Sequence, residues 1–258
     1  MSGHSKWSQI KRQKGAADVK RGKVFTKLAN AVIIAVREGK SGDPVVNFKL
    51  RLAIEQARAA NMPKENIQKA IERALGKSGE ALGVEEVTYE GYGPGGVAVI
   101  IQAATDSKNR TTSEVKNIFE RSGGSLGGPN SVSWMFENQG LINVKVDSKG
   151  ESKSKRVEEI ILTSADLGAQ DAAEAGEIVE IYTKPDELEK IKEDLEKAGF
   201  EIESFEVLEK PKNLVEVTEE GKASQILQFI EKLDSLDDVV EVSANFEIPD
   251  EILSKIGH

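Results

Sequence analysis

Two spacings of hydrophobic residues divide the chain. In residues 1–75, apolar positions recur every three to four residues, as in Phe25, Leu28, Val32 and Ala35 of a predicted helix over about 16–37. This spacing is typical of amphipathic helices. From residue 84 onward, short segments rich in β-branched and aromatic residues alternate with helical segments, which indicates strands and helices in turn. The glycine-containing segment 76–83 between the two parts predicts a linker.

The first part predicts further helices after the one over 16–37. A loop over 38–44 precedes a helix to about residue 60, whose inward positions are Phe48, Leu52 and Ala53. The last helix has a proline in its first turn and a glycine at its stop. Its apolar face comprises Ile67, Ala70, Ile71, Ala74 and Leu75.

The second part predicts an α+β fold. Two strands joined by GPGG (93–96) precede a helix starting at Thr111 or Thr112, with Thr111 and Glu114 as a capping box, and a strand candidate over 131–137. Residues 140–208 then give the order β-α-β-β-α-β, which is typical of the ferredoxin-like fold. Residues 213–247 add a strand, a helix and a strand. We therefore predict a helical domain (1–78) and a middle α+β domain (84–138 plus 209–247) with a third, ferredoxin-like α+β domain (139–208) inserted in it.

Charge is distributed as unevenly as the hydrophobic pattern. The chain of 258 residues carries a formal charge of -9, yet residues 1–78 hold 17 Lys and Arg against 6 Asp and Glu, a net charge of +11, and the remainder carries -20. Such asymmetry suggests a polyanionic partner for the basic part. Cysteine is absent, and the apolar stretches are too short to span a membrane, so we expect a cytoplasmic protein without a membrane partner.

The basic part offers rows of cations for a phosphate backbone. Lys20, Lys23 and Lys27 share one helix face, and Lys69, Arg73 and Lys77 form a second row. Singly, each would be expected simply to solvate a helix; together they favour nucleic-acid contact. Trp7 could stack on an unpaired base or pack with Ile10. Because no recognisable helix-turn-helix is present, structured RNA, single strands and backbone-dominated DNA contact all remain open.

Three other segments have a local chemistry of interest. The glycines at 93–96 lead into a strand, so a β-turn is favoured over a phosphate loop. Lys108, Asn109 and Arg110 form a polar corner before the helix at Thr111, which suits phosphate or sugar contact, although ordinary capping and a solvated turn are the favoured explanation from these residues alone. The glycine-rich stretch 121–134 is either a pliable connection or a close approach to an RNA backbone.

Little in the sequence indicates catalysis. The two histidines, His4 and His258, lie at the ends of the chain, and the acidic pairs 85–86 and 237–238 lack ligand spacing. We expect no cofactor and no small-molecule substrate. A metal-dependent nuclease remains the alternative, because its carboxylates could come from distant segments.

Several long stretches resemble one family. They are GHSKWSQIKRQKGAADVKRGKVFTKL, AIEQARAANMPKENIQKAIERA, YEGYGPGGVAVIIQAATDSKNRT, GGSLG and ANFEIP, and together they resemble the YebC/PmpR family over nearly the whole chain. The resemblance implies a helical first domain and two α+β domains, one inserted in the other. It also implies a cytoplasmic regulator that binds DNA, or a ribosome-associated factor that relieves translation stalled at proline-rich stretches. The segments KWSQIKRQK, DSKNRTT and GGSLGG then become the favoured contacts.

The resulting hypothesis is a nucleic-acid-binding regulator without catalytic activity. Its partner is DNA, or ribosomal RNA and tRNA on the ribosome; the lack of a major-groove reader favours RNA. The candidate contact residues are Lys6, Trp7, Lys11, Arg12, Lys14, Lys20, Arg21, Lys23, Lys27, Lys108, Asn109 and Arg110.

Overall fold

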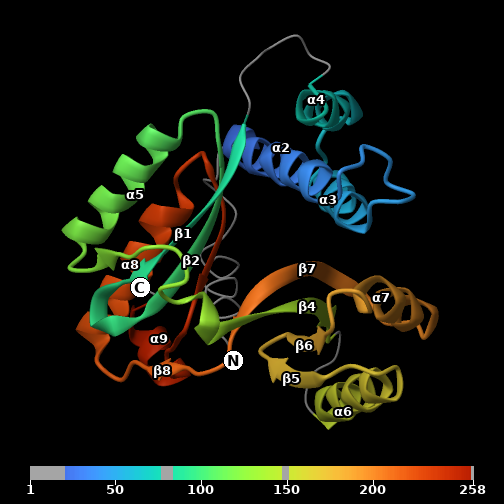
Figure 1. Ribbon diagram of the computed structural model, residues 1–258. Coiled ribbons are helices and arrows are strands. Elements are labelled where there is room, and N and C mark those ends of the chain that lie inside the picture. Colours follow the sequence, from blue (N-terminus) through green and yellow to red (C-terminus); the bar gives the residue numbers. More distant parts are fainter. Residues whose placement is uncertain (1–20, 77–83, 147–150, 257–258) are drawn as a thin grey trace. The chain divides into compact units, whose positions relative to one another are not determined.

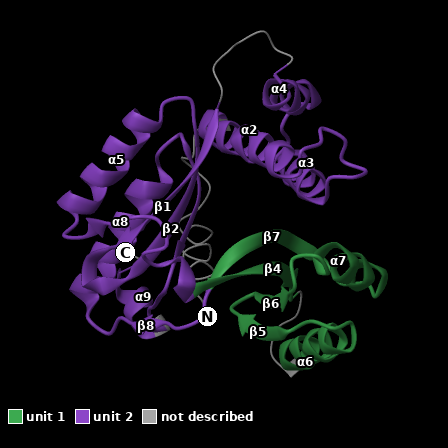
Figure 2. Ribbon diagram, viewed as in Figure 1, with its two compact units in different colours: residues 1, 136–210 green, residues 2–135, 211–258 purple. Residues whose placement is uncertain are grey.

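The computed structural model describes residues 21–76, 84–146 and 151–256 (Figure 1). Within them, residues 136–210 form one compact unit, and the remaining residues form a second (Figure 2). The α+β class is confirmed, with helices first and mixed helices and antiparallel sheets after them. The exact limits of the three predicted domains stay a prediction. None of the described helices is long and apolar enough to cross a membrane.

Three described helices build the basic part: α2 (Arg21–Glu38), α3 (Phe48–Ala59) and α4 (Lys64–Ala74). Their apolar faces meet in a core that includes Val32, Leu50 and Ala57, each fully buried. The predicted inward positions of α3 are confirmed for Leu52 and Ala53, whereas Phe48 is only half-buried. The predicted start of the first helix lies outside the described residues.

Asn47 ties α2 to α3. Its side-chain oxygen caps α3 by accepting a hydrogen bond from the Leu50 N–H, and its amide nitrogen donates to the carbonyls of Ala35 and Ser41 at 2.8 Å each. The α4 helix begins after Pro63, as expected from the fixed φ of proline. It is followed by Gly76 at φ +70°, a left-handed conformation that favours glycine.

The rest of the second unit is a four-stranded sheet covered by helices. The strands are β1 (Glu85–Tyr92), β2 (Ala98–Thr105), β3 (Ser125–Leu126) and β9 (Val239–Ala244), in the order β3-β1-β2-β9. The helices α5 (Lys108–Arg121) and α8 (Glu220–Asp234) contribute to the core on one face, where the rings of Phe119 and Phe229 meet edge to face at 4.9 Å. Short elements complete the unit: η1 (Pro94–Gly96), η2 (Ser133–Met135), the parallel pair β8 (Val215–Glu216) and β10 (Phe246–Glu247), and α9 (Asp250–Ile256).

Alternate residues of β2 face two different cores. Val99, Ile101 and Ala103 pack with α5 and α8, whereas Ala104 packs with the helical domain. This alternation is the period of a strand that is covered on both faces. The GPGG segment makes the tight β1–β2 connection, with the Gly93 N–H donating to the Val97 carbonyl at 2.8 Å, as predicted for a turn.

Two predicted boundaries were wrong. The helix α5 begins at Lys108 after an N-cap at Ser107, so Lys108, Asn109 and Arg110 lie in its first turn and not in a loop before it. Thr111 therefore cannot cap the helix, and its side chain is buried instead. The strand candidate over 131–137 is a loop and a 3-10 turn until β4 starts at Phe136, because the backbone there is held by a carboxylate described below.

The other compact unit has the predicted ferredoxin-like topology. Its elements are β4 (Phe136–Lys145), α6 (Glu151–Asp166), β5 (Asp171–Ala175), β6 (Ile178–Thr183), α7 (Leu188–Lys197) and β7 (Ile202–Pro211). The strand order β5-β6-β4-β7 places β6 between the two strands that α6 connects, and β6 is antiparallel to both. This is the split βαβ arrangement.

Candidate nucleic-acid interface

Half of the predicted contact residues lie at the start of the chain. Lys6, Trp7, Lys11, Arg12, Lys14 and Lys20 fall outside the described residues, and Arg21 is the first residue of α2. Their role in binding stays a prediction.

The next cations of α2 lie against an acidic turn formed by residues 234–238 (DSLDD). Lys27 Nζ is 2.9 Å from Asp234 Oδ1 and also donates to the Asp234 carbonyl, and both side chains are mostly buried, at 22% and 17% exposure. Lys23 Nζ donates to the Ser235 carbonyl at 3.3 Å and lies 3.8 Å from Asp237 Oδ1. Lys27 is thus engaged within the protein, whereas Lys23 stays half exposed.

The polar corner is organised by Asp238 of the same turn. Its Oδ2 accepts hydrogen bonds from Arg110 Nη2 at 2.7 Å, Thr111 Oγ1 at 2.6 Å and Thr105 Oγ1 at 3.1 Å. Burial acts to raise the pKa of Asp238, but these donors outweigh it and hold the pKa below its ordinary value. Hydrogen bonding to Asp238 in turn raises the pKa of Arg110. The carboxylate therefore fixes the first turn of α5 to the acidic turn between α8 and β9.

The structure brings only some of the predicted residues together. A cavity of about 500 Å³ is lined by Lys23 and Arg110, together with Glu114 and the turn residues 235–238. Lys108 and Asn109 do not line it; both are exposed on the first turn of α5. Three carboxylates and two cations share this cavity, so it is not a simple anion site.

A buried glutamate holds the glycine-rich loop over 123–134, which we call the glycine loop. Glu90 of β1 is only 6% exposed, and its carboxylate accepts the backbone N–H groups of Asn130, Val132 and Ser133 at 2.8–2.9 Å. Burial acts to raise the pKa of Glu90, but these three donors hold the pKa below its usual value. The second half of the glycine loop is therefore fixed to the sheet.

Two exposed aromatic side chains lie beside this fixed segment. Trp134 is 64% exposed, and its indole N–H donates to the Ser131 carbonyl at 3.2 Å. The Tyr92 hydroxyl donates to the same carbonyl at 3.4 Å. Lys212 Nζ donates to the Trp134 carbonyl at 3.0 Å. Exposed aromatic rings next to a cation are a common surface for stacked bases.

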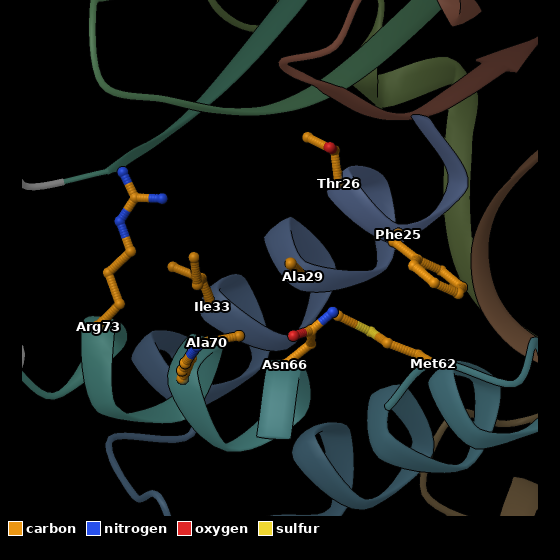
Figure 3. Close-up of a pocket in the computed structure, with 9 residues that line it drawn as sticks. Phe25, Thr26, Ala29, Ile33, Met62, Asn66, Ala70 and Arg73 are labelled. Atoms are coloured by element: carbon orange, nitrogen blue, oxygen red, sulfur yellow. The ribbon is translucent and has the colours of Figure 1, made fainter. Parts of the chain in front are cut away.

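The helical domain contains a groove between α2 and α4, with a volume of about 290 Å³ (Figure 3). Phe25 lies at one end of it and Arg73 at the other. Its floor is apolar, with Ile33 and Met62 among the lining side chains. Between these ends the groove is lined by two small residues, Ala29 of α2 and Ala70 of α4.

The edges of this groove are polar and positive. Asn66, Lys69 and Arg73 follow one face of α4, and Thr26 lies on α2. Among the residues that the structure describes, none forms a hydrogen bond or ion pair with Lys69 or Arg73, and the Nε of Arg73 is buried without a partner. The terminal nitrogens of the same guanidinium are not buried, so a ligand can supply their acceptor.

Sequence reasoning recognised the cations of α4 as a row but missed the groove, the Glu90 anchor and Trp134. The spacing of Phe25, Ala29 and Ile33 predicts that these residues share one face of a helix. It does not predict the groove, which also depends on the residues of the helix opposite. Nothing in the sequence around Glu90 distinguishes it from the other acidic residues of the chain. Over residues 21–76, 84–146 and 151–256, no three His, Asp or Glu side chains come together as metal ligands would.

Comparison with known proteins gives a consistent result along the chain. A sequence model of the TACO1/YebC N-terminal domain matches residues 5–77, and one of the TACO1/YebC second and third domains matches residues 84–246. A "Probable transcriptional regulatory protein" of Chloroflexus aggregans is 51% identical over 256 residues, which cover 99% of both chains. One of Thermotoga maritima with the same name is 48% identical over 99% of both chains.

A solved structure has the same fold. The crystal structure of a conserved hypothetical protein from Aquifex aeolicus superposes with a TM-score of 0.80 at 45% sequence identity, covering 92% of this chain and 94% of that one. The two matched models meet at the linker that separates the helical domain from the α+β part. The chain therefore belongs to the TACO1/YebC family.

Proposed function

We propose that this protein is a non-enzymatic, nucleic-acid-binding regulator of gene expression. The observation that carries the proposal is the concentration of positive charge in the helical domain, where residues 1–78 have a net charge of +11 in a protein of -9. A phosphate backbone is attracted by such a domain and repelled by the acidic remainder. The names of the relatives, probable transcriptional regulatory proteins, support a regulatory role.

The proposed contact residues are the cations of residues 6–27 and those of α4. Lys69 and Arg73 lie on α4 without a carboxylate partner among the described residues, so their charge is available to a ligand. Lys108, Asn109 and Arg110 are added to this set, while Lys27 would have to leave Asp234, and Arg110 would have to leave Asp238, to contact a phosphate. The exposed ring of Trp134 adds a place for a base to stack.

We favour RNA, including ribosomal RNA and tRNA on the ribosome, over promoter DNA. A short connection, residues 60–63, joins α3 to α4, but the outward side of α4 carries Glu65 and Glu72 beside Lys69 and Arg73, and these carboxylates would oppose the phosphates on either side of a major groove. Crosslinking in cells, followed by parallel sequencing of bound DNA and RNA, tests the choice. Enrichment of promoter DNA without RNA would reverse it.

The salt dependence of binding tests the charge argument. Replacing Lys11, Arg12 and Lys14 by Gln should weaken binding to a labelled oligonucleotide and lower the slope of log K against log salt by about 2–3, since each phosphate contact contributes about 0.7–0.9. The matched control replaces three exposed lysines of the α+β part, Lys155, Lys190 and Lys232, by Gln. Equal slopes for both variants would contradict the proposal.

The alternative function, a metal-dependent nuclease, predicts cleavage that needs a divalent ion. Binding that persists in chelator with the oligonucleotide intact is the result expected for a regulator. Cleavage that appears with added Mg²⁺ or Mn²⁺ and disappears with chelator would establish the nuclease instead.

A further inference from the structure

The groove between α2 and α4 combines an apolar floor with unpaired positive charge. Its volume of about 290 Å³ lies just below the range for small-ligand sites, about 300–1,000 Å³. It is suited to one flat group and not to a helix of a partner protein. The two cations are four residues apart on α4, so they lie one above the other on the same face of the helix.

The floor and the edge suit different parts of one ligand. The ring of Phe25 and the side chains of Ile33 and Met62 offer an apolar surface to a planar group. The amide of Asn66 carries both donors and an acceptor, so it can pair with the edge of a base. The terminal nitrogens of the Arg73 guanidinium are not buried, and they can donate to a phosphate oxygen.

We infer that this groove binds a single unstacked base of an RNA or DNA strand, with the flanking phosphates on Lys69 and Arg73. The inference rests on the proposed function and specifies it: the protein takes hold of single-stranded or locally opened nucleic acid. A duplex keeps its bases paired and stacked, so it cannot fill the groove.

Other ligands satisfy only half of the groove. Free phosphate would pair with the cations but leave the apolar floor exposed to water. An uncharged apolar peptide would cover the floor but bury Lys69 and Arg73 without counter-charges, which is costly. A nucleotide within a strand meets both requirements.

Methionine NMR gives a direct test on the full chain. The protein has three methionines, Met1, Met62 and Met135, so labelling their methyl groups gives few signals, and a Met62→Leu variant assigns the one in the groove. A single-stranded 12-mer should shift the Met62 signal through the ring current of the bound base. A blunt duplex of the same length should leave it in place, and inorganic phosphate should do the same.

Two variants separate the base from the phosphates. Phe25→Leu keeps the apolar side chain but removes the ring, and because stacking is worth about 1–3 kcal/mol per base, we expect about tenfold weaker binding of the single strand. Lys69→Gln with Arg73→Gln should lower the salt slope by about 1.4, at about 0.7 per phosphate of a single strand. Unchanged melting temperatures verify that both variants fold.

The matched control removes two charges from the same domain outside the groove. Arg58→Gln with Lys64→Gln is suitable, because Lys64 precedes Arg73 by nine residues and so lies on the other side of α4. If the single strand binds tightly while Met62 does not shift and Phe25→Leu has no effect, the groove assignment is wrong and the proposed function stands. If no nucleic acid binds the unmodified protein, the proposed function itself fails.

Discussion

At the scale of single residues, Glu90 has the clearest effect on structure. Its buried carboxylate accepts three backbone N–H groups of the glycine loop, and Gln in its place cannot accept all three equally well. We expect Glu90→Gln to lower the free energy of unfolding at pH 7 by about 2–3 kcal/mol, because hydrogen bonds to a buried charge are strong and their donors would be left unpaired. Urea unfolding of both proteins measures this difference.

The same carboxylate predicts a pH dependence. Because the pKa of Glu90 is lower in the folded state than in the unfolded chain, its contribution is complete above the unfolded value of about 4.3 and is lost as the pH falls through the folded value. The stability difference between the unmodified protein and Glu90→Gln should therefore shrink below about pH 4. A difference that stays constant down to pH 3 would show that Glu90 acts by shape and not by charge.

At the scale of elements, most helices and strands could be predicted from the sequence. The spacing of apolar residues was sufficient for α3, α4 and the β-α-β-β-α-β order, because burial of one face decides these elements. The start of α5 and the loop before β4 could not be predicted. The loop before β4 is held by Glu90, a carboxylate distant in the sequence, which accepts its backbone N–H groups. Asp238 accepts from the hydroxyl of Thr111, so Thr111 does not cap α5, and the helix begins after Ser107 instead.

Within the glycine loop, two glycines should differ in their response to substitution. A Cβ on Gly124 would lie 2.5 Å from the Tyr92 carbonyl oxygen and 3.0 Å from Gly93 Cα, and backbone atoms cannot easily move away. Gly124→Ala should cost about 1–3 kcal/mol of stability, as overpacking does. Gly128→Ala meets no atom within 4 Å and should change stability by less than about 0.5 kcal/mol. Comparing the melting temperatures of the Gly124→Ala and Gly128→Ala variants decides whether close packing or chain flexibility explains the glycines of this loop.

At the scale of the whole molecule, the sequence shows that positive charge is concentrated in residues 1–78 and negative charge in the remainder. It does not show that residues of the two parts form ion pairs with each other. The spacing of Lys23 and Lys27 predicts that they share a face of α2, yet nothing local shows that this face meets the acidic turn more than 200 residues later. Part of the predicted phosphate-binding surface is therefore neutralised within the protein. Any polyanion that uses Lys23 competes with Asp237 for it.

This competition predicts that removing an acid should strengthen binding. Asp237→Asn releases Lys23 from an exposed ion pair, whose side chains are 53% and 67% exposed, so it should hardly change stability. Binding of an oligonucleotide at low salt should become about two- to fivefold tighter, the equivalent of one weak surface pair. Glu158→Gln, which removes the same charge from an exposed position on α6, is the control for net charge. If both variants tighten binding equally, the acidic turn acts only through the overall charge of the protein; if only Asp237→Asn does so, the turn directly restrains the binding surface of α2.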